Sequence, residues 1–284
     1  MSTTVRDVQR AVETLWPAAG AEEWDAIGLV SGDPEAPVSR ILLAVDAVAA
    51  TVDEAVAAGA QLLLTHHPLL LRGVTSVSAE RFKGALLARL IRSGCALLAV
   101  HTNADAVDSG TSGVLAARLG IADAAPFAAG PNGDGIGRVG DLPAPTTLGR
   151  LARAVAALLP ATAGGVRVSG EFERPVRRVA VCGGAGDAFL AHPAVLAADA
   201  YITADLRHHP AQEAREQAAI SGGPALVDVS HWASEWLWLD VAAEQLRGVL
   251  PGVEVVVSEL RTDPWDFVIV QGTERGEDGT QGGA

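Results

Sequence analysis

The sequence is poor in cysteine and in aromatic residues. Its 284 residues include only 2 cysteines, Cys95 and Cys182, and aromatic residues make up 4% of the chain. The cysteines lie in separate apolar runs and form no CxxC motif, so we interpret both as buried apolar residues. This excludes a disulfide framework and favours a reducing compartment, and we therefore predict a cytoplasmic protein.

Basic residues and long apolar runs are also scarce. The chain has 34 acidic and 21 basic residues, a formal net charge of -13 at pH 7. Non-specific nucleic-acid binding needs clustered Lys and Arg, so a nucleic-acid partner is not expected. Residues 1–10 lack the apolar core of a signal peptide, and no window reaches the length of a membrane span. The acidic excess fits cation binding, although surplus surface carboxylate explains it equally well.

Apolar strand patterns alternate with amphipathic helix patterns along most of the chain. This alternation, together with a hydrophobic fraction of 49%, predicts an α/β fold with a substantial core. Strands are predicted at 41–46, 62–64, 95–100, 176–181, 200–203, 225–229, 253–258 and 266–270. Helices are predicted at 4–15, 49–58, 80–92, 111–119, 146–159, 188–196, 206–219 and 231–250. Between Pro126 and Pro145 the pattern lapses into Gly, Pro, Asn and Asp, which favours a domain crossing there.

Two adjacent histidines, His66 and His67, follow the apolar run Leu62–Leu64. Such a run is typical of a buried strand in a parallel sheet, and ligands bind at the carboxyl ends of these strands. Neighbouring residues on a continuing strand point to opposite faces. Pro68 indicates that the chain leaves the sheet here, which would let both rings serve one cluster. The alternative is a pair of hydrogen-bonded histidines that caps the strand.

Two further pairs combine a histidine with a carboxylate four residues later. His101 and Asp105 follow a predicted strand, whereas His231 and Glu235 open a predicted helix with Ser230 as its N-cap. Four histidines and two carboxylates suit zinc, iron, manganese or cobalt, and six ligands suit two ions better than one zinc ion. Alternatively, the first pair is a hydrogen-bonded turn and the second a solvated helix pair.

A fourth polar cluster, Asp205 to His209, also follows a predicted strand. It could supply a general acid or base, or bind a substrate phosphate through Arg207. Equally, Asp205 could be the N-cap of the helix that follows. The glycines of Cys182–Gly186 match neither common nucleotide-binding motif, so they indicate nucleotide binding only weakly.

The motifs taken together resemble the NGG-interacting-factor-three-like family of hexameric proteins with a dinuclear metal centre. Members of this family are often labelled GTP cyclohydrolase type-two homologues. The resemblance extends from Trp24 to about Glu259 and is specific for the set of motifs rather than for any one of them. The motifs are Thr65-His66-His67-Pro68, His101-Thr102-Asn103-Ala104-Asp105, Gly137-Arg138-Val139-Gly140, Val181-Cys182-Gly183-Gly184, Ile202-Thr203-Ala204-Asp205 and His231 to Glu235.

The resemblance implies two α/β halves, the first completed by the C-terminal helix and strands. The implied domains are a metal-binding domain of residues 1–125 plus 230–271 and a second domain of residues 126–229. Residues 272–284 are Gly-rich and polar, and we expect a disordered tail there. The resemblance also implies a toroidal homohexamer and a two-metal site. Its metal ligands would be His66, His67, His101, Asp105, His231 and Glu235.

The leading hypothesis for function is a metal-dependent hydrolase-like protein. Two divalent ions per chain (zinc, iron or manganese) would activate a water for attack on a small phosphorylated or heterocyclic substrate. Asp205 or His209 is the expected proton-transfer residue. The rival hypothesis is a non-enzymatic hexameric scaffold that stores or displays metal. Ions that keep an open position facing a cavity would favour the enzyme, and saturated coordination would favour the scaffold.

Overall fold

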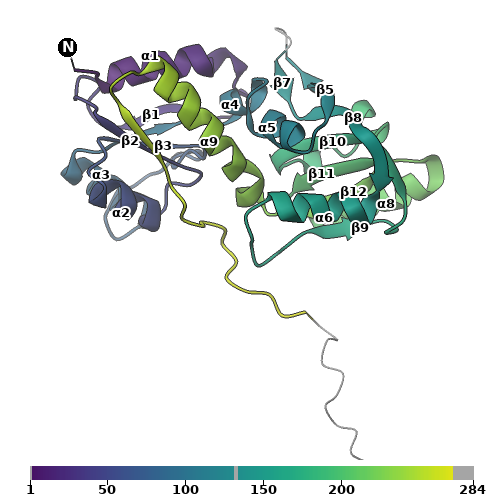
Figure 1. Ribbon diagram of the computed structural model, residues 1–284. Coiled ribbons are helices and arrows are strands. Elements are labelled where there is room, and N and C mark those ends of the chain that lie inside the picture. The colour runs from purple at the N-terminus through teal and green to yellow at the C-terminus, as the bar shows by residue number, and fades with distance from the viewer. Residues whose placement is uncertain (1, 131–133, 271–284) are drawn as a thin grey trace, which may run out of the picture.

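A computed structural model describes residues 2–130 and 134–270 of the chain. The predicted disordered tail, residues 272–284, lies outside the described residues. The described chain forms two large sheets, each flanked by helices, and a third sheet of two strands, with one long helix lying across the middle of the molecule (Figure 1). The fold is therefore α/β, as the sequence predicts.

The helices follow the predicted amphipathic segments closely where a capping residue marks their start. Thr4 caps the first helix with a reciprocal capping box, and Thr147 and Ser230 cap two later helices through their hydroxyls. The α-helices are α1 (Val5–Leu15), α2 (Ala49–Ala57), α3 (Phe82–Ser93), α4 (Thr102–Ala106), α5 (Thr111–Arg118), α6 (Leu148–Leu158), α7 (Pro193–Leu196), α8 (His208–Ser221) and α9 (His231–Val249).

The first sheet has five strands in the order β1-β4-β3-β2-β13. Four of them are parallel, and β1 pairs antiparallel with β4 at one edge. Because the four are parallel, the chain segments that follow β2, β3 and β4 all emerge at one edge of the sheet. The strands are β1 (Gly28–Ser31), β2 (Arg40–Ala44), β3 (Leu62–Thr65), β4 (Ala96–Ala99) and β13 (Glu254–Val257).

The second sheet has six strands in the order β5-β8-β10-β11-β12-β9. Strands β10, β11 and β12 are parallel, and the remaining three pair antiparallel to their neighbours. A two-stranded sheet, β6 (Ala128–Ala129) with β7 (Gly135–Ile136), is formed by the chain between β5 and β8. The six strands are β5 (Ala122–Ala125), β8 (Arg138–Thr147), β9 (Arg167–Ser169), β10 (Pro175–Ala185), β11 (Ala200–Ala204) and β12 (Ala225–Val229).

Two predicted elements were wrong, and one strand was not predicted. The segment expected to be a domain crossing contains β8, whose prolines fall where the register with β10 shifts and no ladder bond is needed. The helix expected at 188–196 is a 3-10 turn (Asp187–Phe189) followed by the short helix α7, because Pro193 can only begin a helix. The strand expected at 266–270 is not formed, since no described strand pairs with it.

One apolar core joins the two sheets through α9. Trp238 and Leu239 of α9 pack in the same cluster as Leu43 and Leu64 of the first sheet and Ile202 of the second. Residues 122–125 lie before the predicted boundary yet belong to the second sheet. The division into two domains therefore stays a prediction. Among the described residues, no helix is both long and apolar enough to cross a membrane.

Candidate metal centre

His66 and His67 reach the site because β3 ends at Thr65. Both backbone amides still bond to the end of β2, with His66 N donating to Ala44 O (3.1 Å) and His67 N to Val45 O (2.8 Å). The two ring centroids lie 5.1 Å apart. The two rings therefore share one cluster, as the break at Pro68 predicts, instead of facing opposite sides of the sheet.

The second pair forms one helical turn at the end of the neighbouring strand. His101 occupies the N-cap position of α4, and the Asp105 amide donates to the His101 carbonyl (3.1 Å). The turn places one carboxylate oxygen of Asp105 3.8 Å from Nε2 of His66. Asp105 also accepts a hydrogen bond from the Thr111 hydroxyl.

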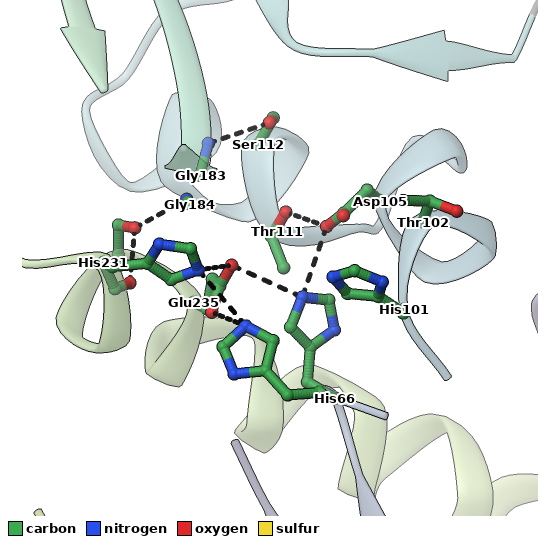
Figure 2. A network of polar contacts seen from close by, with 12 residues as sticks. His66, His101, Thr102, Asp105, Thr111, Ser112, Gly183, Gly184, His231 and Glu235 are labelled. Carbon is green, nitrogen blue, oxygen red and sulfur yellow. Dashed lines mark hydrogen bonds and ion pairs between the residues drawn. The ribbon is translucent and has the colours of Figure 1, made fainter. Parts of the chain in front are cut away.

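The third pair comes from the first turn of α9. His231 and Glu235 lie on one helix face, and Nε2 of the histidine is 3.0 Å from Oε1 of the carboxylate. The other oxygen of Glu235 lies 2.9 Å from Nε2 of His67. Figure 2 shows His66, His101 and Asp105 on the side opposite His231, with Glu235 between. The structure thus brings all six predicted ligands to one place.

Each histidine in this cluster is held by its Nδ1 atom. The ring of His66 bonds to the Val100 carbonyl (3.0 Å). The other three bond to carboxylates, and the pairs are His67 with Asp46 (2.7 Å), His101 with Asp25 (2.9 Å) and His231 with Asp205 (2.7 Å). A histidine fixed in this way presents its Nε2 atom to a metal ion.

The donor set fits a cation. Two overlapping groups have ligand atoms within 4.8 Å of one another: His66, His67 and His101, and then His67, His231 and Glu235. Nε2 of His66 is buried and has no hydrogen-bond partner. Nε2 of His67 faces Nε2 of His231 at 3.2 Å, which is an arrangement that a shared positive charge stabilises.

The electrostatics of the cluster also favour added positive charge. Burial disfavours the imidazolium form, but Glu235, together with Asp46 for His67 and Asp205 for His231, outweighs it and raises the pKa of His67 to about 10 and of His231 to about 11. Although burial opposes ionisation of Glu235, these two rings hold its pKa well below the usual range. Burial raises the pKa of Asp105. The carboxylates around the cluster therefore favour positive charge on these rings, and a divalent ion would compete with protons for the same Nε2 atoms.

The two residues predicted to transfer a proton lie in different places. Asp205 lies at the end of β11 with a φ of 57° and bonds to His231, and it does not cap α8. His209 lies in the exposed first turn of α8, where its ring packs on His208. Arg207, the suggested phosphate ligand, pairs instead with Asp187. The structure brings Asp205 to the cluster and leaves His209 outside it.

Sequence analysis missed three groups that touch the cluster. Asp25 lies outside every predicted helix and strand, yet its side chain is 1% exposed and also accepts a hydrogen bond from the Thr102 amide. Asp46 directly follows an apolar strand, and this was a usable signal. Gly184 has a φ of +69°, and an added Cβ would lie 2.4 Å from Oε1 of Glu235. That glycine therefore permits close approach of backbone to ligand, and it does not form a nucleotide loop.

A cavity of about 740 Å³ opens beside the cluster. Both His67 and His231 line it, with side chains 25% and 30% exposed, whereas His66 is fully buried and Glu235 is 4% exposed. The cluster is therefore closed on one side and accessible to a small molecule on the other.

Comparison with known proteins gives a consistent result. A family model described as Duf34/NIF3 (NGG1p interacting factor 3) matches residues 3–264. A Streptomyces coelicolor protein named GTP cyclohydrolase 1 type 2 homolog is 47% identical over 267 residues, which cover 91% of this chain and 92% of that protein. A Mycobacterium tuberculosis protein of the same name is 35% identical, with coverage of 94% and 98%.

Solved structures share the fold. A hypothetical protein of Staphylococcus aureus matches with a TM-score of 0.85 and 24% identity, covering 94% of this chain and 100% of its own. A Bacillus cereus protein related to NIF3 matches with a TM-score of 0.84 and 22% identity, at the same coverage.

Proposed function

The chain belongs to the Duf34/NIF3 family, and from this premise we propose that it is a metal-dependent hydrolase-like protein with two divalent ions per chain. The proposed ligands are His66, His67, His101, Asp105, His231 and Glu235. The observation that carries the proposal is the convergence of the four histidine rings on the carboxylates of Glu235 and Asp105, with Nε2 of His66 buried and without a hydrogen-bond partner. Zinc, iron and manganese all suit this donor set.

The proposed ligands differ in their exposure, and we assign their roles accordingly. Divalent ions, when bound, lower the pKa of water and polarise phosphoryl or carbonyl oxygens. Glu235 and His66 lie at the closed side of the cluster, where they would hold an ion away from solvent. His67 and His231 border the cavity, so a small substrate would meet the site there.

The role that the geometry supports for Asp205 is to orient His231. Its carboxylate accepts from Nδ1 of that ring, and this bond lowers the pKa of Asp205. A carboxylate with a lowered pKa is ionised at neutral pH but is a weak base, so a proton-transfer role for Asp205 stays a prediction. A proton-transfer role for His209 stays a prediction, since its ring does not line the cavity.

Metal analysis tests this proposal directly. We expect about two ions per chain in protein purified without chelators, and a sharp loss in His67→Ala. His208→Ala, which changes an exposed ring on α8, serves as the matched control and should keep the wild-type content. Full metal content in His67→Ala, or none in the wild type after titration with zinc, iron or manganese, would refute the shared site.

The choice of substrate follows from the relatives. Curated relatives are named GTP cyclohydrolase 1 type 2 homolog, so GTP and simple phosphoesters are the first compounds to assay with the metal-loaded protein. Turnover that disappears on chelation and returns with metal would support the hydrolase. A metal-loaded protein without turnover would favour the scaffold. We also propose that the chain forms a homohexamer, which light scattering would test.

A further inference from the structure

The segment after β13, residues 259–270, runs past the metal centre as an extended chain that we call the C-terminal arm (Figure 1). Two consecutive residues fix it in place. The Thr262 hydroxyl donates to Asp46 (2.5 Å), and Asp263 accepts from the Ser230 hydroxyl (2.5 Å). Asp46 orients His67, and Ser230 caps the helix that begins at His231. The arm is therefore attached to the supports of two proposed ligands.

Beyond these attachments the arm lines the cavity. The Trp265 amide bonds back to Asp263 (3.1 Å), which holds the tryptophan close to the anchored residues. Trp265, Phe267 and Val268 line the same cavity of about 740 Å³ as His67 and His231. Trp265 is 68% exposed and Phe267 is 78% exposed. Two large aromatic side chains thus stand open to water within the cavity that leads to the cluster.

Exposed aromatic side chains beside a polar site indicate a ligand that covers them. Grouped apolar surface left open on a folded chain marks binding sites, and aromatic rings prefer to pack against other planar rings. In the same cavity, His67 and His231 offer the proposed metal site, which attracts anionic oxygens. The cavity therefore combines an aromatic wall with an anion-binding end.

We propose that the C-terminal arm forms a substrate subsite, in which Trp265 and Phe267 hold an aromatic ring while an anionic group of the same molecule reaches the metal centre. The substrate class is thus an aromatic or heteroaromatic compound that carries a phosphate-like group. This inference rests on the proposed function for the anionic end alone. The aromatic wall is a separate feature of the arm.

Binding of two non-hydrolysable probes tests the subsite. Phenylphosphonate and methylphosphonate share the anionic group and differ in the ring, so calorimetric titration of the metal-loaded protein isolates the ring's contribution. We expect phenylphosphonate to bind about three- to tenfold more tightly, as ring packing contributes beyond simple burial. In Trp265→Ala/Phe267→Ala this preference should disappear, with methylphosphonate affinity unchanged.

Two control variants sharpen the result. Trp265→Phe keeps a planar ring and should retain much of the preference. Phe82→Ala removes an equally exposed ring, 65% exposed at the start of α3 and outside the cavity lining, and should behave as wild type. No preference in the wild type, or a preference that survives in the double variant, would overturn the subsite.

The same samples separate this proposal from two others. Metal content, measured on each sample, decides the proposed function by itself, while the phenyl preference is compared between samples of equal metal content. If the double variant changes the molar mass in light scattering and keeps the wild-type preference, the aromatic side chains contact a second copy of the chain, and the subsite proposal is wrong.

Discussion

At the scale of single residues, three aspartates determine how the clustered histidines are presented. Asp46, Asp25 and Asp205 each bond to an Nδ1 atom and thereby leave the Nε2 atom facing the cluster. Asp46 is itself held by Thr262, so its orientation is fixed from two sides. Groups that support a ligand in this way affect metal affinity nearly as strongly as the ligand does.

Replacing Asp46 with asparagine should weaken metal binding without removing a ligand. The amide keeps the shape of the side chain but no longer favours the His67 tautomer that presents Nε2. We expect affinity to fall about 10- to 100-fold in competition with a chromophoric chelator. Asp240→Asn, an exposed change on α9, should leave affinity unchanged. Equal affinity in the two variants would show that Asp46 does not orient the ring.

The sequence indicated the ligands but only some of their supports. His66, His67, His101 and His231 stand at strand ends or a helix start, where local pattern identifies them. Asp25 lies 76 residues from His101, and no spacing rule joins them. Their proximity depends on tertiary packing, which a single sequence does not display.

At the scale of elements, a glycine bulge brings the second sheet to the metal centre. The register between β10 and β11 shifts between Val181 and Ala185, and Gly184 lies within the shift. Its amide donates to the Ser234 hydroxyl (2.9 Å) on α9. The bulge turns the end of β10 toward the helix that carries His231 and Glu235.

Adding one methyl group at Gly184 should therefore impair the site. In Gly184→Ala the new Cβ would lie 2.4 Å from Oε1 of Glu235 and 3.3 Å from Nε2 of His231. Gly59→Ala is a matched control, since Gly59 has a φ of +65° and open space around it. Both variants should lose about 1–2 kcal/mol of stability to backbone strain, measured by urea denaturation. Only Gly184→Ala should also lose metal, about tenfold or more in the chelator assay. Wild-type metal affinity in Gly184→Ala would mean that the Glu235 side chain can shift away from the new methyl group without weakening metal binding.

Helices and strands were predicted correctly where apolar runs are buried. Strands were predicted wrongly where their formation depends on hydrogen bonding to a neighbouring strand. The apolar segments of β2, β3, β4 and β12 are buried and were predicted correctly. Strand β8 was missed because Pro143 and Pro145 read as a loop. Residues 266–270 were predicted as a strand from β-propensity, yet a strand also needs a neighbour with which to bond.

At the scale of the whole molecule, α9 joins two sheets into one apolar core. Its buried residues pack in one cluster with side chains from both sheets. If one sheet unfolds, the other sheet therefore loses the apolar contacts that the two share through α9. We expect a single cooperative unfolding transition.

The two cysteines report on this transition separately. Cys95 lies at the first sheet and Cys182 in the second, both buried, and burial raises their pKa values to about 11 and about 12. Neither should react with an alkylating reagent in the native protein. In Cys95→Ala and Cys182→Ala, the remaining thiol should become reactive at the same urea concentration. Different midpoints would instead show two domains that unfold independently.

Because α9 and β13 lie near the end of the sequence, they are synthesised after the other parts of the proposed site and of the first sheet. Residues 41–105 provide three histidines and an aspartate early in synthesis, but His231 and Glu235 emerge more than a hundred residues later. At about 5–20 residues per second, the nascent chain spends several seconds with four of the six proposed ligands and with the β2 edge unpaired. The candidate group of His67, His231 and Glu235 therefore forms only in a nearly finished chain, and we expect a prematurely terminated product to retain at most the group of His66, His67 and His101.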